Sequence, residues 1–146
     1  MADIVAVARR VLHLKKITST MKMQKLVFYA QAHALATRGK PLFDDDFQAW
    51  VNGPVAPTLF REHRGKFMIR EDELPTVEKQ LTTEEQTVVD SVVSELGSLT
   101  GNQLSKRTHG EDPWKMARGN TPAGMACDAV ISQASMAEFY AEHPIL

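Results

Sequence analysis

The sequence predicts a mainly α protein: a single compact helical domain over residues 1–146, with about five to seven helices and two short β-strands near residues 47–51 and 66–70. Three observations support this class. Apolar residues recur at three- and four-residue spacing in several segments. Capping boxes precede two of these segments. The 146 residues contain no repeat, low-complexity tract or Pro/Ser-rich linker, and they are enough for one domain with its own core.

The N-terminal half is predicted to hold two long helices. The first runs from about Asp3, whose carboxylate can cap it, to Lys16. The second runs from about Met21 to Thr37, with Thr20 as its cap and Gly39 at its end. Its apolar arc is wider than a one-sided amphipathic helix needs, so we expect it at the centre of the fold. The remaining edge of this helix carries Lys22, Tyr29 and His33.

Residues 40–70 are predicted to break the helical pattern. Pro41, Gly53, Pro54 and Pro57 forbid a continuous helix, and Phe47–Val51 alternates as a short strand does. Pro57 suits the first turn of a helix that ends at about Arg64. Residues 66–70 form a second extended segment, which we expect to pair with 47–51.

The C-terminal half is punctuated by caps. Thr82-x-x-Glu85 is a capping box before a helix that Gly97 ends, and Thr100-x-x-Gln103 is another before a helix that Gly110 ends. Asp112-Pro113-Trp114 begins a short helical turn. Ser132 opens a last helix that runs to about Glu142.

Composition excludes several classes of protein. Apolar residues make up 43% and charged residues 24%, which is typical of a globular domain, and the formal charge of −1 gives no electrostatic reason for nucleic acid as the main partner. A single cysteine, Cys127, excludes an internal disulfide. The chain starts without a basic and apolar leader and has no long apolar run, so we expect a cytoplasmic protein with no membrane partner.

No catalytic, cofactor-binding or metal-binding residues are predicted. The five histidines and Cys127 lack the paired spacing of a zinc site, and no phosphate-loop, dinucleotide-binding or nucleophile-elbow motif occurs. Asp44-Asp45-Asp46 does not fit a calcium loop and is expected to be a solvated turn. We therefore expect a protein that is not an enzyme and needs no cofactor.

Aromatic and polar residues are the remaining candidates for function. The edge with Lys22, Tyr29 and His33 is either the solvated side of its helix or an interface stripe with an aromatic centre. Trp50 is either a core aromatic that fixes the turn at Gly53-Pro54, which we favour, or a ligand-stacking residue. Trp114 carries the same ambiguity, because the turn that presents it is expected to be superficial.

Several segments resemble the Panacea domain of the SocA-like antitoxins. They are Met23–Ala32 (MQKLVFYAQA), Gly39–Asp44 with Asp46–Trp50, Gly53–Pro57 with Leu59–Arg61, Leu104-Ser105 with Thr108–Trp114, and Ile131-Ser132 with Met136, Phe139 and Tyr140. The resemblance spans essentially the whole chain in order. One departure is Phe60, where the family often has tyrosine.

The resemblance implies an antitoxin that binds and neutralises a cognate protein toxin, as an adaptor that delivers the toxin to a Clp-type AAA+ protease. An adaptor needs two surfaces. We expect the toxin-binding surface at Lys22, Lys25, Tyr29 and His33, and the second interface at His109, Trp114, Phe139 and Tyr140. Trp50, Gly53, Pro54 and Pro57 are expected to be structural.

Two alternatives stay open. A DNA-binding autoregulatory transcription factor is suggested by Lys106, Arg107 and His109, although weak net charge and the absence of a recognition helix disfavour it. A small-molecule enzyme would require a ligand or metal site that the sequence does not show.

Overall fold

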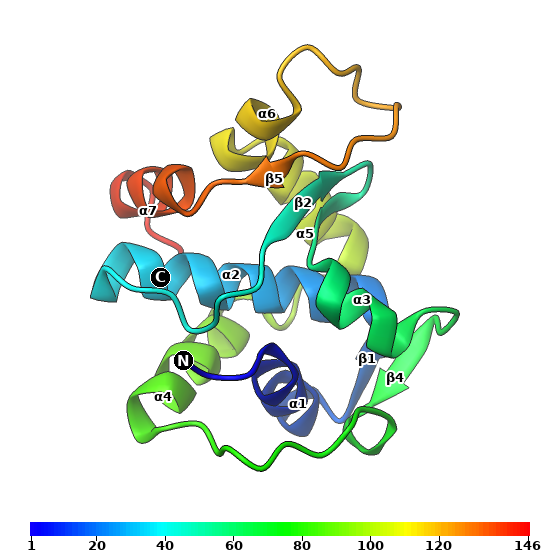
Figure 1. Cartoon of the computed structure of the whole chain (residues 1–146), viewed down its shortest axis with the longest axis vertical. Coiled ribbons are helices and arrows are strands. Elements are labelled where there is room, and N and C mark those ends of the chain that lie inside the picture. The colour runs from blue at the N-terminus through cyan, green and yellow to red at the C-terminus, as the bar shows by residue number, and fades with distance from the viewer.

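The computed structural model describes all residues 1–146 and confirms a mainly α domain (Figure 1). The helices are α1 (Ile4–Lys15), α2 (Thr20–Arg38), α3 (Pro57–His63), α4 (Thr83–Leu96), α5 (Gly101–His109), α6 (Asp112–Arg118) and α7 (Gln133–Glu142), with one 3₁₀ turn, η1 (Glu71–Glu73). The strands are β1 (Ile17–Ser19), β2 (Phe47–Trp50), β3 (Gly53–Val55), β4 (Met68–Arg70) and β5 (Val130–Ile131).

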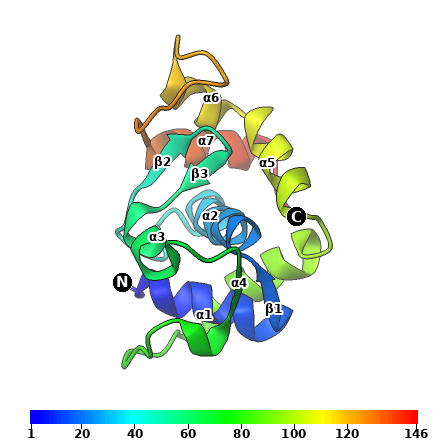
Figure 2. The same cartoon turned by 90° about the vertical axis from the view of Figure 1, so that its right-hand side faces the viewer.

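Helix α2 lies at the centre of the molecule, as its wide apolar arc predicts. It runs between a layer made by α1 and α4 and a layer made by α5, α6, α7 and the β2–β3 hairpin (Figure 2). Its buried residues include polar ones: Met23, Gln24, Lys25, Leu26, Val27, Phe28, Tyr29, Ala30, Gln31, Ala32, Ala34 and Leu35. Burial on all sides means that side chains of α2 must find their polar partners inside the protein.

The N-cap of α2 is Ser19, not Thr20 as predicted. The backbone N–H of Lys22 donates to Ser19 Oγ over 3.1 Å. The helix starts one residue early because β1 ends at Ser19, whose extended backbone is the conformation that an N-cap requires. The Thr20 hydroxyl instead donates to the carbonyl of Lys66 at 3.0 Å, which ties the helix start to the chain before β4.

The capping boxes are present as predicted. The Thr82 and Thr100 hydroxyls accept from the N–H groups of Glu85 and Gln103, whose side chains accept from the two threonine N–H groups in return. Pro57 occupies the first turn of α3, where its missing N–H has no helical partner to lose.

The two predicted strands exist but do not pair with each other. β2 pairs with β3 and β5 in a three-stranded antiparallel sheet, while β4 pairs with β1 in a separate two-stranded sheet. The prediction of pairing was wrong because a tight turn at Val51-Asn52 folds the chain back on β2 at once. Helix α3 then carries the chain away to the start of α2 before β4 begins (Figure 1).

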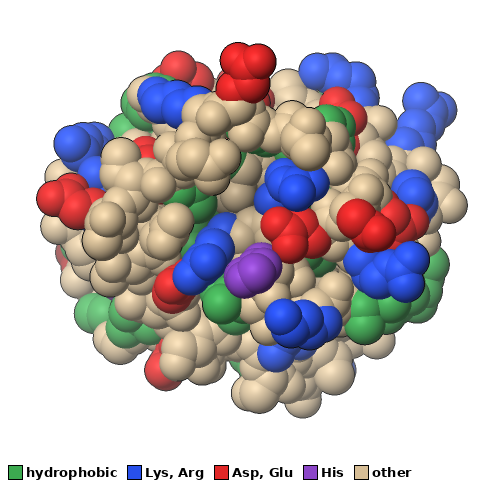
Figure 3. Space-filling view, turned by 90° about the horizontal axis from the view of Figure 1, so that it is seen from below, with side chains coloured by type: hydrophobic (Ala, Val, Ile, Leu, Met, Phe, Trp, Pro, Cys, Tyr) green, Lys and Arg blue, Asp and Glu red, His purple; other side chains and the backbone are tan.

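The surface shows no single-sign region on the face below α1 and α4. Lys and Arg side chains are intermixed there with Asp and Glu side chains (Figure 3). A mixed face of this kind lacks the continuous basic stripe that tracks a nucleic-acid backbone. No helix of the protein combines the length and the apolar character that crossing a bilayer requires.

Candidate functional site

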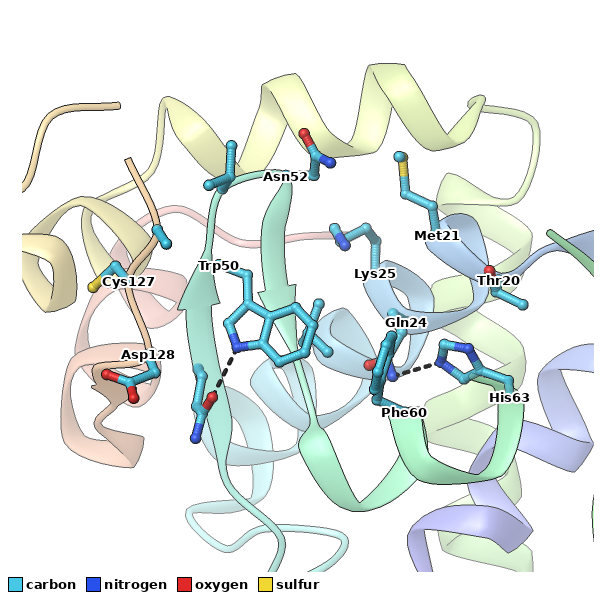
Figure 4. A pocket seen from close by; sticks show the side chains of 14 residues that line it. Thr20, Met21, Gln24, Lys25, Trp50, Asn52, Phe60, His63, Cys127 and Asp128 are labelled. Carbon is cyan, nitrogen blue, oxygen red and sulfur yellow. Dashed lines mark hydrogen bonds between the residues drawn. The ribbon is translucent and has the colours of Figure 1, made fainter. Parts of the chain in front are cut away.

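A pocket of about 830 Å³ opens beside the N-terminal half of α2. Its walls come from α2, the β2–β3 hairpin, α3 and the loop between α6 and β5 (Figure 4). The lining residues are Thr20, Met21, Gln24, Lys25, Gln48, Trp50, Val51, Asn52, Val55, Phe60, His63, Ala126, Cys127 and Asp128. This volume lies within the range of pockets that bind ligands or inserted side chains.

Lys25 is the charged residue of the pocket interior. Its side chain extends from α2 toward the hairpin and is only 1% exposed (Figure 4). The ammonium takes part in none of the ion pairs or side-chain hydrogen bonds of the protein, and burial lowers the pKa of Lys25 to about 7. Since burial disfavours the charged form, the protein carries an uncompensated amine here.

The path of the Lys25 side chain depends on Gly53. A Cβ at position 53 would lie 2.6 Å from Lys25 Cε and 2.8 Å from Thr108 Oγ1. Gly53 also has a φ of 113°, which side-chain-bearing residues rarely adopt. Gly53 is therefore structural, as predicted from the sequence: the absence of a side chain at this position leaves room for the Lys25 side chain against the hairpin.

Gln24 and His63 form a fixed polar pair next to Lys25. The N–H of Ala56 donates to Gln24 Oε1 at 3.0 Å, which orients the amide so that its nitrogen donates to His63 Nε2 at 2.9 Å. His63 must accept this bond as a neutral ring. Its pKa is lowered, mainly by burial and further by the charge of Lys25, while a hydrogen bond to its own backbone acts in the opposite direction.

Trp50 and Phe60 form the aromatic wall of the pocket. Their ring centroids lie 5.1 Å apart in an edge-to-face arrangement, and Trp50 Nε1 donates to Gln48 Oε1 at 2.8 Å. The interpretation of Trp50 as a core residue is wrong in this respect: it is half-buried on the pocket side of β2, whereas Ala49 faces the core. Side chains alternate along a strand, so the apolar pattern fitted either face.

Helices α5 and α6 hold the hairpin in place through its carbonyl groups. Arg118 Nη1 donates to the carbonyl of Ala49 at 2.7 Å, Trp114 Nε1 to that of Trp50 at 2.8 Å, and Ser105 Oγ to that of Asn52 at 2.6 Å. These bonds satisfy backbone acceptors that the short sheet leaves free. They fix the pocket wall against the helical layer.

Trp114 and His109 therefore belong to the frame of the pocket. Trp114 is 5% exposed, so its turn is not superficial as expected, and the His109 ring stacks on it with centroids 4.1 Å apart. The pKa of His109 is lowered chiefly by burial, with the charges of Lys25 and Arg118 acting in the same direction and the Val51 carbonyl against them.

Tyr29 and Tyr140, which were predicted on two different surfaces, meet inside the protein. Both hydroxyls donate to Glu111 Oε1, over 2.5 Å from Tyr29 and 2.8 Å from Tyr140, and the two rings lie 5.9 Å apart. Tyr29 is 0% and Tyr140 2% exposed. Burial, together with the Glu111 carboxylate, raises the pKa of Tyr29; for Tyr140, burial comes first, followed by the charges of Tyr29 and Glu111. Neither tyrosine can contact a partner in this conformation.

Lys22, His33 and Phe139 are half-buried and lie outside the pocket. Lys22 Nζ donates to the carbonyl of Gly97 at 2.5 Å, where a cation complements the C-terminal end of α4. Phe139 stacks on His143 with centroids 4.4 Å apart. The predicted polar edge of α2 is therefore not one surface, because neighbouring helices divide it.

Sequence reasoning missed four pocket residues that carry its chemistry: Gln24, Phe60, His63 and Asp128. Gln24 and Lys25 are adjacent polar residues beside the apolar run Leu26-Val27-Phe28, and this was the available signal. His63 and Asp128 gave none, because they come from segments that only the tertiary structure brings together. No three His, Cys, Asp or Glu side chains converge in a way that could hold a metal ion.

Comparison with known proteins assigns the chain to a family. The profile of the SocA-like antitoxin family, Panacea domain, matches residues 23–115, which include Lys25, Trp50, Phe60 and His63. The chain belongs to this family of antitoxin domains. It is also similar to antitoxin SocA of Caulobacter vibrioides (strain NA1000 / CB15N), at 40% identity over 43 residues. That match covers 30% of this chain and 23% of the relative. No solved structure matches the chain.

Proposed function

We propose that this protein is an antitoxin that binds and neutralises a cognate protein toxin, and that the toxin docks on the face that carries the Lys25 pocket. Membership of the antitoxin family supports the class. The single observation that carries the choice of face is the open pocket, which brings together the buried Lys25 of α2, Trp50 on the firmly held hairpin and Phe60 on α3. Aromatic residues are enriched at protein interfaces, and tryptophan in particular is enriched among binding hot spots.

The pocket is better suited to binding than to catalysis. An amine with a lowered pKa can act as a nucleophile, but it then needs a neighbouring group that moves protons. His63 Nε2 is already occupied by the Gln24 amide, and Asp128 lies on the opposite wall of the pocket (Figure 4). We infer that the protein acts in the cytoplasm by binding alone, without a cofactor.

The residues proposed to contact the toxin are accordingly revised. Lys25 remains from the original set, joined by Trp50 and Phe60 as half-buried aromatic contacts. Tyr29 is withdrawn because it is fully buried, and Lys22 is assigned to the end of α4.

Two half-buried aromatic residues give a matched test of this face. We expect Trp50→Ala to weaken toxin binding by at least about 30-fold, the effect of losing an interface anchor of about 2 kcal/mol. Phe139→Ala, on α7, should leave the affinity within about threefold. The measurement is calorimetric titration with the product of the adjacent gene, beside rescue of growth when that product is expressed. Equal affinity of Trp50→Ala and wild type would place the toxin elsewhere.

The adaptor role is the finer part of the proposal. We propose that the protein delivers the toxin to a Clp-type AAA+ protease, which requires a second surface separate from the pocket. Trp114 and Tyr140 are buried and the half-buried ring of His109 stacks on Trp114, so we assign this second surface to the half-buried Phe139 on α7. Holding a toxin near a protease raises its effective concentration there.

Reconstituted degradation of the toxin tests the adaptor role. Substoichiometric antitoxin should accelerate toxin turnover by the protease, and Phe139→Ala should slow this turnover while toxin binding persists. Neutralisation that needs a full equivalent, with no faster turnover, would instead identify an antitoxin that masks the toxin.

The DNA-binding alternative loses part of its support. Arg107 lies 3.5 Å from Glu111 and over the ring of Tyr29, so its guanidinium is engaged within the fold, and α6 is only seven residues long. Affinity for promoter DNA that falls steeply with salt concentration would restore this alternative.

A further inference from the structure

The pocket contains a buried lysine amine without an acidic partner. Lys25 is 1% exposed and forms no ion pair, and its charge contributes to the lowered pKa values of His63 and His109. Asp128 lies on the opposite wall of the pocket (Figure 4) and forms no ion pair with Lys25. No acidic side chain of the protein therefore pairs with this amine, and an anion from outside would favour its charged form.

We propose that the pocket receives the carboxylate of an aspartate or glutamate side chain on an apolar segment of the toxin, which lies across the pocket mouth and forms an ion pair with Lys25. The inference rests on the proposed toxin binding and specifies its chemistry. Lys25 fixes the position of the acidic residue in the pocket. The lining of the pocket determines which side chains can flank that residue on the toxin segment.

The walls require apolar neighbours around the carboxylate. A volume of about 830 Å³ is much larger than one carboxylate, and the lining includes the apolar residues Met21, Trp50, Val55 and Phe60. Apolar side chains on both sides of the acidic residue fill this space. They also exclude water from the ion pair, which strengthens it.

Exposed apolar residues on both sides of the mouth indicate that the segment passes across it. Phe67 is 79% exposed, and its carbonyl accepts from the N–H of Thr20 at one end of the pocket. Met125 is 59% exposed and precedes Ala126 at the other end. A chain terminus would use only one flank, whereas a continuous segment covers both. This favours a side-chain carboxylate over a C-terminal one.

Short peptides test the chemistry without the toxin. The first probe is an acetylated and amidated peptide with one aspartate between two phenylalanines, and the second has asparagine in its place. The third is the asparagine peptide with a free C-terminal carboxylate. The NMR signal of the Trp50 indole N–H reports binding, because this residue lines the pocket.

We expect the aspartate peptide to bind wild type at least about tenfold more tightly than the asparagine peptide. Lys25→Met should remove the preference. A preference that is absent, or that persists in Lys25→Met, overturns the carboxylate assignment. Tighter binding of the peptide with the free C-terminus overturns the choice of a side chain.

Two lysines of α2 give the matched test with the toxin. Lys25→Met should weaken binding of the adjacent gene product by about 30-fold or more, while Lys22→Met should stay within about threefold. Lys22 is a half-buried lysine on the same helix whose ammonium binds the carbonyl of Gly97 outside the pocket. Circular dichroism and thermal melting establish that both variants fold.

The outcomes separate this inference from the proposed function. If wild type and Lys25→Met bind the toxin equally, the protein remains a toxin-binding antitoxin and the carboxylate inference is wrong. If wild type does not bind the toxin at all, the proposed function is wrong, and the inference that an acidic toxin segment binds the pocket is wrong with it. Each acidic residue of the toxin can be replaced with its amide, one at a time. We expect a single such replacement to weaken binding by as much as Lys25→Met does.

Discussion

A lysine ammonium loses most of its hydration when its side chain is buried, and Lys25 gains no partner in return. The same residue is the one that we propose for partner recognition. Such a group lowers the stability of the free protein and regains that free energy only in the complex. At the scale of single residues, stability and binding therefore act against each other at this position.

Lys25→Met is expected to stabilise the free protein at neutral pH. Each unit by which the pKa of Lys25 is lowered corresponds to about 1.4 kcal/mol, and methionine fills a similar volume without a charge. We expect the melting temperature to rise by more than about 5 °C. Differential scanning calorimetry of both proteins at pH 7 measures this. An unchanged or lower melting temperature would show that the ammonium is not isolated.

Gly53→Ala is expected to destabilise the protein by at least about 2 kcal/mol, because the new Cβ meets Lys25 and Thr108 and the backbone has a positive φ. Gly65→Ala is the matched control, since Gly65 has a φ of 86° with nothing within 4 Å of the added Cβ. Urea unfolding should show a clearly smaller loss for the control. Equal losses would assign the whole effect to the backbone conformation.

At the scale of elements, Glu111 connects the helices α2, α5 and α7, which are far apart in the sequence. It lies in the turn between α5 and α6 and accepts hydrogen bonds from Tyr29 on α2 and Tyr140 on α7. Arg107 lies 3.5 Å from its other oxygen. One carboxylate thus fixes the C-terminal helices against the central one, and the α5–α6 unit in turn holds the hairpin of the pocket.

Glu111→Ala should lower the free energy of unfolding by about 2–4 kcal/mol, because it leaves two buried hydroxyls without an acceptor. In a protein that carries Tyr29→Phe and Tyr140→Phe, the same substitution should have a much smaller effect, with a coupling of at least about 1 kcal/mol. Urea unfolding of the four proteins completes the cycle. Additive losses would mean that the tyrosines find other partners.

At the scale of the whole molecule, buried titratable groups determine how stability depends on pH. The pKa of Lys25 is lowered to about 7, so the folded protein binds fewer protons there than the unfolded chain between about pH 7 and 10. Stability therefore rises with pH across this window, and Lys22, whose pKa burial also lowers, acts in the same direction. Tyr29 and Tyr140 have raised pKa values, so their ionisation in the unfolded chain reverses the trend above about pH 10.

We expect the free energy of unfolding of wild type to increase from pH 7 to about pH 9.5, with a slope of up to about 1.4 kcal/mol per pH unit. Below about pH 6.5 it should decrease, because His33, His63 and His109 have lowered pKa values and protonate first in the unfolded chain. Urea unfolding across this range measures the profile, and Lys25→Met should be nearly flat between pH 7 and 9. A wild-type profile without the rise would contradict the buried amine.

Local features of the chain made most of the fold predictable. Capping boxes at Thr82 and Thr100, the proline at position 57 and the wide apolar arc of α2 act through neighbours within one or two turns. The pairing of the two predicted strands was wrong, because pairing depends on the path of the chain between them. The candidate site was predictable only in part: Lys25 was named, but as one of a toxin-binding set with Lys22, Tyr29 and His33 rather than as the interior of a pocket.

The amino-acid sequence alone predicted the class of fold, the central place of α2, the capping boxes at Thr82 and Thr100, and the resemblance to the antitoxin family, which the match over residues 23–115 bears out. The side of α2 that each polar residue faces is known only from the folded protein. A helix enclosed by neighbours has no solvent side from which its polar residues can be read, so the surroundings of Lys25 and the partners of Tyr29 depend on α3, α5, α7 and the β2–β3 hairpin. Those partners come from residues up to about a hundred positions away, and distant packing leaves no periodic signal in the chain.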